Sequence, residues 1–110
     1  MSLLILWTPI ALQSLSEVFA YTFEEFGERQ LRKLTSQIYA VTKRISSFPN
    51  SGKVEYEITK AAGIEYRSVK LIKEISLLYT VVDDAIYIEF VKNARIDDAT
   101  MLEKILSKDD

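Results

Sequence analysis

Two runs with a helical apolar period, at residues 9–26 and 28–48, constrain the fold of this chain more than any other feature. Thr8 before Pro9 is typical of a helix start, and Gly27 is typical of a helix end. The apolar positions recur every three or four residues: Leu12, Leu15, Phe19, Thr22 and Phe26, then Leu31, Leu34, Ile38, Val41, Ile45 and Phe48. This spacing predicts an apolar face on each of two helices. Because so few residues separate them, we expect an antiparallel helical hairpin.

The hairpin needs a second layer, because contacts along one seam do not offset the conformational entropy lost in ordering about forty residues. The second half of the chain supplies it. Three runs rich in β-branched and aromatic residues are predicted as strands: IEYRSVKLI (64–72), EISLLYTVV (74–82) and AIYIEFVK (85–92). Alternation in the last run predicts one apolar face that carries Ile86, Ile88 and Phe90. Residues 3–7 are predicted as a further short strand.

Two segments complete the expected architecture. Residues 53–63 are ambiguous, since KVEYEI alternates like a strand whereas TKAAG ends like a helix. Residues 96–106 are predicted as a short helix capped by Asp97 or Asp98. The order β–α–α–β–β–β–α indicates an α+β fold in two layers, in which the hairpin covers one face of a small, mostly antiparallel sheet and leaves the other face open. We expect one domain at residues 1–106 and a frayed acidic tail at 107–110.

Composition excludes several classes of function. The chain has no histidine and no cysteine, so it cannot use a Ser-His-Asp or Cys-His mechanism, a disulfide or a cysteine zinc site. No ligand spacing for a metal and no glycine-rich phosphate loop is present, and we expect no cofactor. The net charge is −2, without the basic stripe of a duplex-binding protein. The apolar run at residues 3–7 is too short for a signal sequence or membrane span, so we expect a cytoplasmic protein.

Four stretches, taken in order, resemble the RelE/ParE family of bacterial type II toxins. ILWTPIALQSL (5–15) is similar to the opening strand and first helix of the family, and FPNSG (48–52) to the loop after its second helix. EYRSVKL (65–71) is similar to a central strand. ISLLYTVVDDAIYIEFVKNARIDDATML (75–102) is similar to the final strand pair, a following arginine and an Asp-rich lead into the last helix. The resemblance covers nearly the whole chain.

The resemblance implies a toxin that forms an oligomer with a cognate antitoxin, whose amphipathic segment would occupy a hydrophobic groove and an open sheet edge. RelE-like members cut mRNA on the ribosome, whereas ParE-like members inhibit DNA gyrase. The absence of a histidine after the last strand and the low charge place this chain nearer ParE, as an inhibitor that acts by binding. An mRNA endoribonuclease and a non-toxic protein-binding relative remain as alternatives.

The resemblance also singles out two arginines, Arg67 and Arg95. Either could bind phosphate or carboxylate through its planar guanidinium, and an RNA-cutting protein would use it against charge on the scissile phosphate. Each also has a structural alternative. Arg67 could pair with Glu65, Glu55 or Glu57, and Arg95 could pair with Asp97 or Asp98. For Arg95, at the rim of the sheet, we predict contact with a partner macromolecule.

Two further pairs of polar residues are expected to share a face of their strands. These are Ser68 with Lys70 and Tyr87 with Glu89. If both pairs lie on the open face of the sheet, Glu89 could act as a base, Lys70 as a clamp on charge and Tyr87 as an orienting group. Alternating polar side chains are equally expected on any solvated sheet face.

Overall fold

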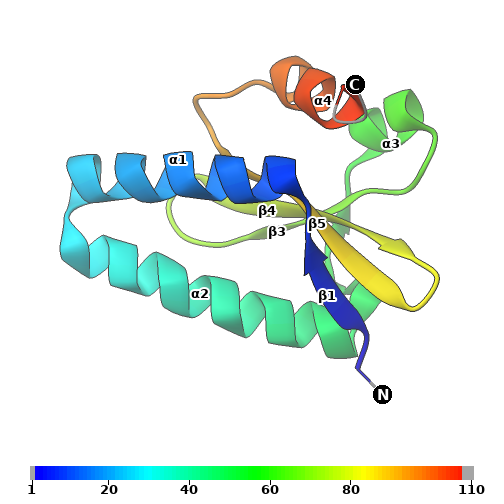
Figure 1. Ribbon diagram of the computed structural model, residues 1–110, viewed down its shortest axis with the longest axis horizontal. Coiled ribbons are helices and arrows are strands. Elements are labelled where there is room, and N and C mark those ends of the chain that lie inside the picture. Colours follow the sequence, from blue (N-terminus) through cyan, green and yellow to red (C-terminus); the bar gives the residue numbers. More distant parts are fainter. Residues whose placement is uncertain (1, 108–110) are drawn as a thin grey trace.

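A computed structural model of the chain describes residues 2–107 and contains one five-stranded sheet with helices on both of its sides (Figure 1). The strand order is β1-β5-β4-β3-β2, with β1 parallel to β5 and all other pairs antiparallel. The predicted α+β fold class is confirmed. The elements are β1 (Leu4–Trp7), α1 (Pro9–Phe26), α2 (Glu28–Ser47), the 3-10 turn η1 (Pro49–Ser51), β2 (Lys53–Val54), α3 (Tyr56–Ala62), β3 (Arg67–Lys70), β4 (Ile75–Val82), β5 (Ala85–Asn93) and α4 (Asp98–Leu106).

The helical hairpin forms as predicted, with the expected residues at its ends. The Thr8 hydroxyl accepts a hydrogen bond from the Ala11 amide at 3.1 Å and caps α1. Gly27 joins the helices at a φ of +85°, a conformation that residues with a Cβ rarely adopt. Asp97 is the N-cap of α4, as one of the two alternatives predicted. Of the expected tail, only Ser107 lies within the described residues.

The buried face of α1 includes Thr22 as predicted but otherwise differs from the predicted seam. Leu12 is 52% exposed and Phe26 is 40% exposed. Phe48, at the end of the seam predicted for the second helix, is 67% exposed. Leu15 and Phe19 pack only partly into the core. The residues buried on α1 are small or β-branched: Ala11, Ser14, Val18 and Thr22. The reason is that α1 lies directly along β5, where bulky side chains would hold the helix away from the strand.

Ser14 explains how α1 replaces a strand at this position. β1 pairs with β5 only as far as Ile88. Beyond that point the Val91 amide of β5 donates a hydrogen bond to the Ser14 hydroxyl at 2.9 Å. A buried side chain thus pairs a backbone group that the short β1 cannot reach.

A register shift in β5 divides its side chains between two cores. Tyr79 pairs with Ile88, but the preceding Leu78 pairs with Phe90, so Glu89 is the extra residue of a bulge. Ile88 therefore faces the hairpin core, whereas Phe90 belongs to the core on the opposite face. The prediction that Phe90 shares a face with Ile86 and Ile88 is wrong for this reason.

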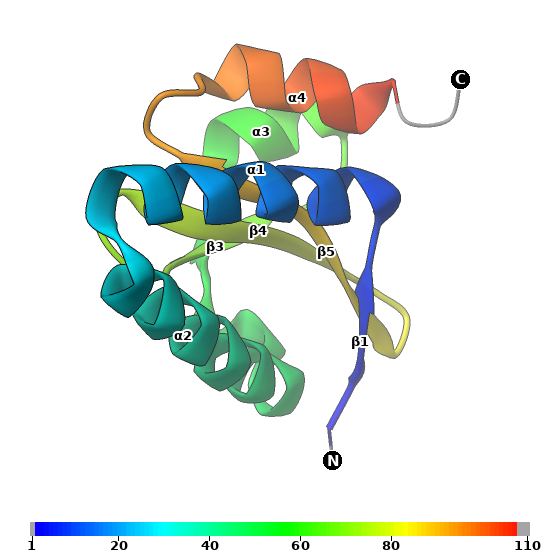
Figure 2. The same cartoon turned by 60° about the vertical axis from the view of Figure 1, so that its left-hand side comes forward.

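The face of the sheet that was expected to be open is partly covered by α3 and α4 (Figure 2). Residues 53–63 form both structures that the sequence left open, because β2 is followed at once by α3. The second core consists of Ile58, Tyr66, Leu78, Phe90, Met101 and Ile105. The prediction of an open face is wrong because α3 and α4 both pack on it and bury this second core.

Candidate functional site

Arg95 lies just beyond β5, at the rim of the sheet, and its side chain is directed toward α1. The Asn93 side chain accepts a hydrogen bond from the Arg95 amide at 2.8 Å, and the Asn93 carbonyl accepts one from the Ile96 amide at 3.2 Å. This turn places the Arg95 guanidinium 5.2 Å from the centre of the Tyr21 ring, in a cation–π contact. Arg95 is exposed to solvent.

The structure does not pair Arg95 with Asp97 or Asp98, the carboxylates proposed as its structural partners. The Asp97 carboxylate accepts a hydrogen bond from the Thr100 amide at 2.8 Å. That bond lowers the pKa of Asp97 below its usual value. Asp98 forms an ion pair with Lys92. Within the described part of the chain, then, Asp97 and Asp98 have other partners and the guanidinium stays on the surface.

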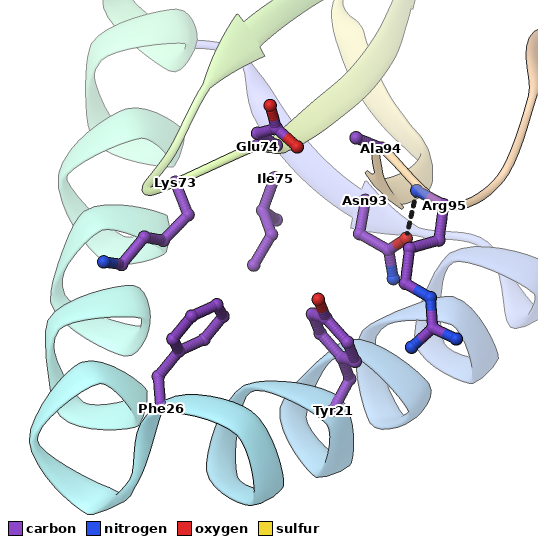
Figure 3. A pocket seen from close by; sticks show the side chains of 8 residues that line it. All are labelled: Tyr21, Phe26, Lys73, Glu74, Ile75, Asn93, Ala94 and Arg95. Carbon is purple, nitrogen blue, oxygen red and sulfur yellow. Dashed lines mark hydrogen bonds between the residues drawn. The ribbon is translucent and has the colours of Figure 1, made fainter.

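A pocket of about 250 Å³ adjoins Arg95 (Figure 3). It is lined mainly by apolar surface from the end of α1, the loop between β3 and β4, and the end of β5. The lining residues are Tyr21, Phe26, Lys73, Glu74, Ile75, Asn93, Ala94 and Arg95. Tyr21 and Phe26 meet edge to face, with ring centres 6.1 Å apart. The Lys73 ammonium lies 4.9 Å from the centre of the Phe26 ring, so each aromatic ring carries one cation.

Arg67 is held by the loop that precedes β2. Its guanidinium donates to the carbonyls of Asn50 at 3.0 Å and Gly52 at 2.8 Å, and to the Glu65 carboxylate at 3.1 Å. The side chain is only 17% exposed. Glu65, one of the three predicted carboxylate partners, is thus confirmed. The two contacts with backbone carbonyls could not be predicted from the sequence. Arg67 fixes the loop at residues 49–52 to β3.

Tyr79 reinforces the same loop from β4. Its hydroxyl donates to the Pro49 carbonyl at 2.7 Å and accepts from the Gly52 amide at 3.0 Å. An added Cβ at Gly52 would lie 2.6 Å from the Tyr79 hydroxyl oxygen, so only glycine fits there. Close packing against Tyr79 therefore explains the glycine of the FPNSG sequence.

The remaining candidates face the side of the sheet that α3 and α4 cover, but they are not gathered in one hollow. Tyr87 and Glu89 line a hollow of about 370 Å³ beside the end of α4, and Glu89 is buried there. Ser68 donates to the Glu55 carboxylate at 2.5 Å and lines another pocket near Met101. Lys70 is exposed and is not part of the lining around Glu89.

Tyr66 shares the hollow with Glu89, and its burial raises the pKa of its phenol to about 12, with a further contribution from the Glu89 carboxylate. A phenol with so high a pKa stays protonated at neutral pH. Among residues 2–107, no three Asp or Glu side chains are placed to hold a metal ion.

The predicted site residues are therefore dispersed and are not gathered around one reacting point. Arg67 lies at the loop before β2, Tyr87 and Glu89 lie near α4, and Arg95 lies at the Tyr21 pocket. The catalytic roles considered for them stay predictions. Sequence reasoning missed Tyr21 and Lys73, because the pocket that they line joins three distant segments that carry no common motif.

Comparisons with known proteins identify what the chain is similar to. The model of a family described as "ParE toxin of type II toxin-antitoxin system, parDE" matches residues 5–97. A solved structure described as "Chromosomal ParDE TA system from P. aeruginosa" superposes with a TM-score of 0.64 at 18% identity, over 84% of this chain and 96% of that one. At this identity the likeness shows the fold alone. No curated protein sequence matches. Among the described helices, none is long and apolar enough to cross a membrane.

Proposed function

Because this chain belongs to the ParE toxin family of type II toxin–antitoxin systems, we propose that it inhibits growth by binding a cellular target of the DNA gyrase type, without catalysing a reaction. A cognate antitoxin binds and neutralises it in the cytoplasm, and the two form an oligomer. The single observation that carries this proposal is the family match, which runs from β1 through the helical hairpin to the end of β5.

The positions of the arginines support binding over catalysis. The Arg67 guanidinium is engaged by two loop carbonyls and Glu65, so its Nε and Nη1 donors are already used within the fold. Arg95 is exposed beside a pocket and is free of ion pairs with the described carboxylates, which suits recognition of another macromolecule.

The border of the sheet supports an antitoxin partner. β1 is the outermost strand on one side of the sheet, and its leucines Leu4 and Leu6 are 62% and 36% exposed. The outermost strand of a sheet is a template on which a partner segment can add another strand. The exposed side chains of α1 and α2, such as Leu12, Phe23 and Tyr39, offer apolar surface for an amphipathic helix.

The proposal is tested by inducing the chain in a host that lacks its antitoxin and by adding the purified protein to a gyrase supercoiling assay. We expect growth arrest and loss of supercoiling. Arg95→Gln should weaken both effects. Arg32→Gln is the matched control, because Arg32 is an exposed arginine on α2 whose recorded partner is Glu28 of the same helix.

Two results would contradict the proposal. Growth arrest with intact supercoiling and ribosome-dependent mRNA cleavage would assign the chain to the RNA-cutting alternative. Harmless induction of a folded, soluble protein would assign it to the non-toxic alternative.

A further inference from the structure

The pocket beside Arg95, which we call the Tyr21 pocket, has the size of a site for one side chain. Its volume of about 250 Å³ is below the range of about 300–1,000 Å³ that is typical of small-molecule sites. Its floor is apolar, because Ile75 is 1% exposed and lies at the start of β4. Figure 3 shows Phe26 and Tyr21 along one wall and the two cationic side chains on either flank. A single bulky apolar side chain would fill this space.

The charges around the pocket favour an acidic partner. Lys73 and Arg95 are cations and Glu74 is the one acid in the lining, so the formal charge of the lining is +1. Among the described residues, neither cation forms an ion pair, and each is held over an aromatic ring instead. A cation placed in this way retains donors that a carboxylate can use.

We propose that the Tyr21 pocket takes one bulky apolar side chain from an acidic polypeptide segment of a partner protein, whose flanking carboxylates bind Arg95 and Lys73. The inference rests on the proposed function in one respect, namely that Arg95 lies on the partner-binding surface, and it adds the chemistry of the partner segment. The apolar anchor provides affinity through burial, and the two cations select acidic neighbours.

The geometry favours a polypeptide over single-stranded nucleic acid. Base binding uses an aromatic face on which a base can stack. Here Tyr21 and Phe26 meet edge to face, and each already carries a cation on its ring.

The test uses the full chain, labelled with nitrogen-15 and made by cell-free synthesis so that toxicity does not limit supply. The probe is an acetylated and amidated heptapeptide with a central leucine and three glutamates on each side. We expect its titration to shift the amide resonances of Lys73–Ile75 and Asn93–Arg95. Replacing the leucine by alanine should weaken binding about tenfold or more, because alanine lacks the methyl groups that leucine buries in the pocket.

Variants of the protein locate the site. Arg95→Gln and Lys73→Gln should each weaken peptide binding about two- to fivefold, as expected for the loss of one solvent-exposed ion pair. Ala94→Phe adds a ring to the pocket wall and should abolish binding. Arg32→Gln should bind as the unmodified chain does. Amide spectra of the free variants show that each is folded before it is titrated.

Several outcomes overturn the inference. These are equal affinity for the leucine and alanine peptides, equal affinity for a peptide with lysines in place of the glutamates, shifts confined to other residues, and tighter binding of oligouridine at the same amides. The growth assay separates this inference from the proposed function. Peptide binding by a harmless protein would refute only the function, whereas a toxic protein that ignores the peptide would refute only the inference.

Discussion

Replacing Arg67 by methionine tests whether this arginine stabilises the fold or acts on a target. The substitution keeps most of the apolar stem and removes every donor. Two bonds to the carbonyls of Asn50 and Gly52 are lost, at a net contribution of about 0.5–1.5 kcal/mol each. The ion pair with Glu65, whose side chain is 56% exposed, adds about 0.2–1 kcal/mol. We therefore expect the free energy of unfolding to fall by about 2 kcal/mol.

Equilibrium unfolding in urea, followed by far-ultraviolet circular dichroism, measures this loss. For a chain of this size the dependence on urea is about 1–2 kcal/mol per molar, so the unfolding midpoint should fall by about 1–2 M. Glu65→Gln is the matched control. It removes the ion pair, leaves both carbonyl bonds of Arg67 in place, and should lower stability by less than about 1 kcal/mol.

An unchanged midpoint in Arg67→Met would refute this account of Arg67. If the same variant also lost its effect on growth, the arginine would be identified as a residue that contacts the target or substrate. A lowered midpoint with growth inhibition retained, at a temperature where the variant is folded, is the result that the structure predicts.

Three further predictions concern stability. Ser14→Ala leaves the β5 amide that it pairs unsatisfied and should lower the free energy of unfolding by about 1–3 kcal/mol, whereas the exposed Ser16→Ala on the same helix should change it little. The raised pKa of Tyr66, about 12, makes the unfolded chain release the phenolic proton first, so stability should decline between pH 10 and 12 in urea titrations and decline less in Tyr66→Phe. The lowered pKa of Asp97, held mainly by the Thr100 amide, stabilises α4 above the ordinary pKa of 3.8, and this stabilisation should disappear on acidification or in Asp97→Ala.

Periodicity and capping residues predicted the main elements of the fold because they act locally. Thr8, Gly27 and Asp97 end or begin helices through hydrogen bonds and backbone angles within a few residues of themselves. The strand runs were recognised by their composition, and their antiparallel order followed from short connections. Where two local preferences compete, as at residues 53–63, the sequence left the conformation undecided, and the chain adopts a two-residue strand and then α3.

The predictions that failed depended on contacts between distant segments. The seam of α1 was placed on its bulkiest residues, but the close approach to β5 buries Ser14 and exposes Leu12. The alternation of β5 was extended through Glu89, but the bulge there moves Phe90 to the other core. Neither the neighbour of a helix face nor an extra residue in a ladder is visible in hydrophobic periodicity alone.

The candidate site shows the same division. The sequence, through its resemblance to a family, identified both arginines. No motif showed that the two arginines differ in role. Contacts across the fold separate them, since Arg67 is bound by loop carbonyls that lie 15 and 17 residues away in the chain. Arg95 meets Tyr21 and a pocket that also includes Lys73.

Local patterns in the sequence were enough to predict most of the helices and strands, the lack of histidine and cysteine chemistry, and the resemblance to the RelE/ParE family. Tertiary structure alone decided which arginine is held within the fold and which remains at the surface beside a pocket. The two kinds of interaction act over different distances along the chain. Helix caps and apolar periods act over a few residues, whereas the partners of a guanidinium are chosen by whichever carbonyls, carboxylates and rings the packed chain brings within reach.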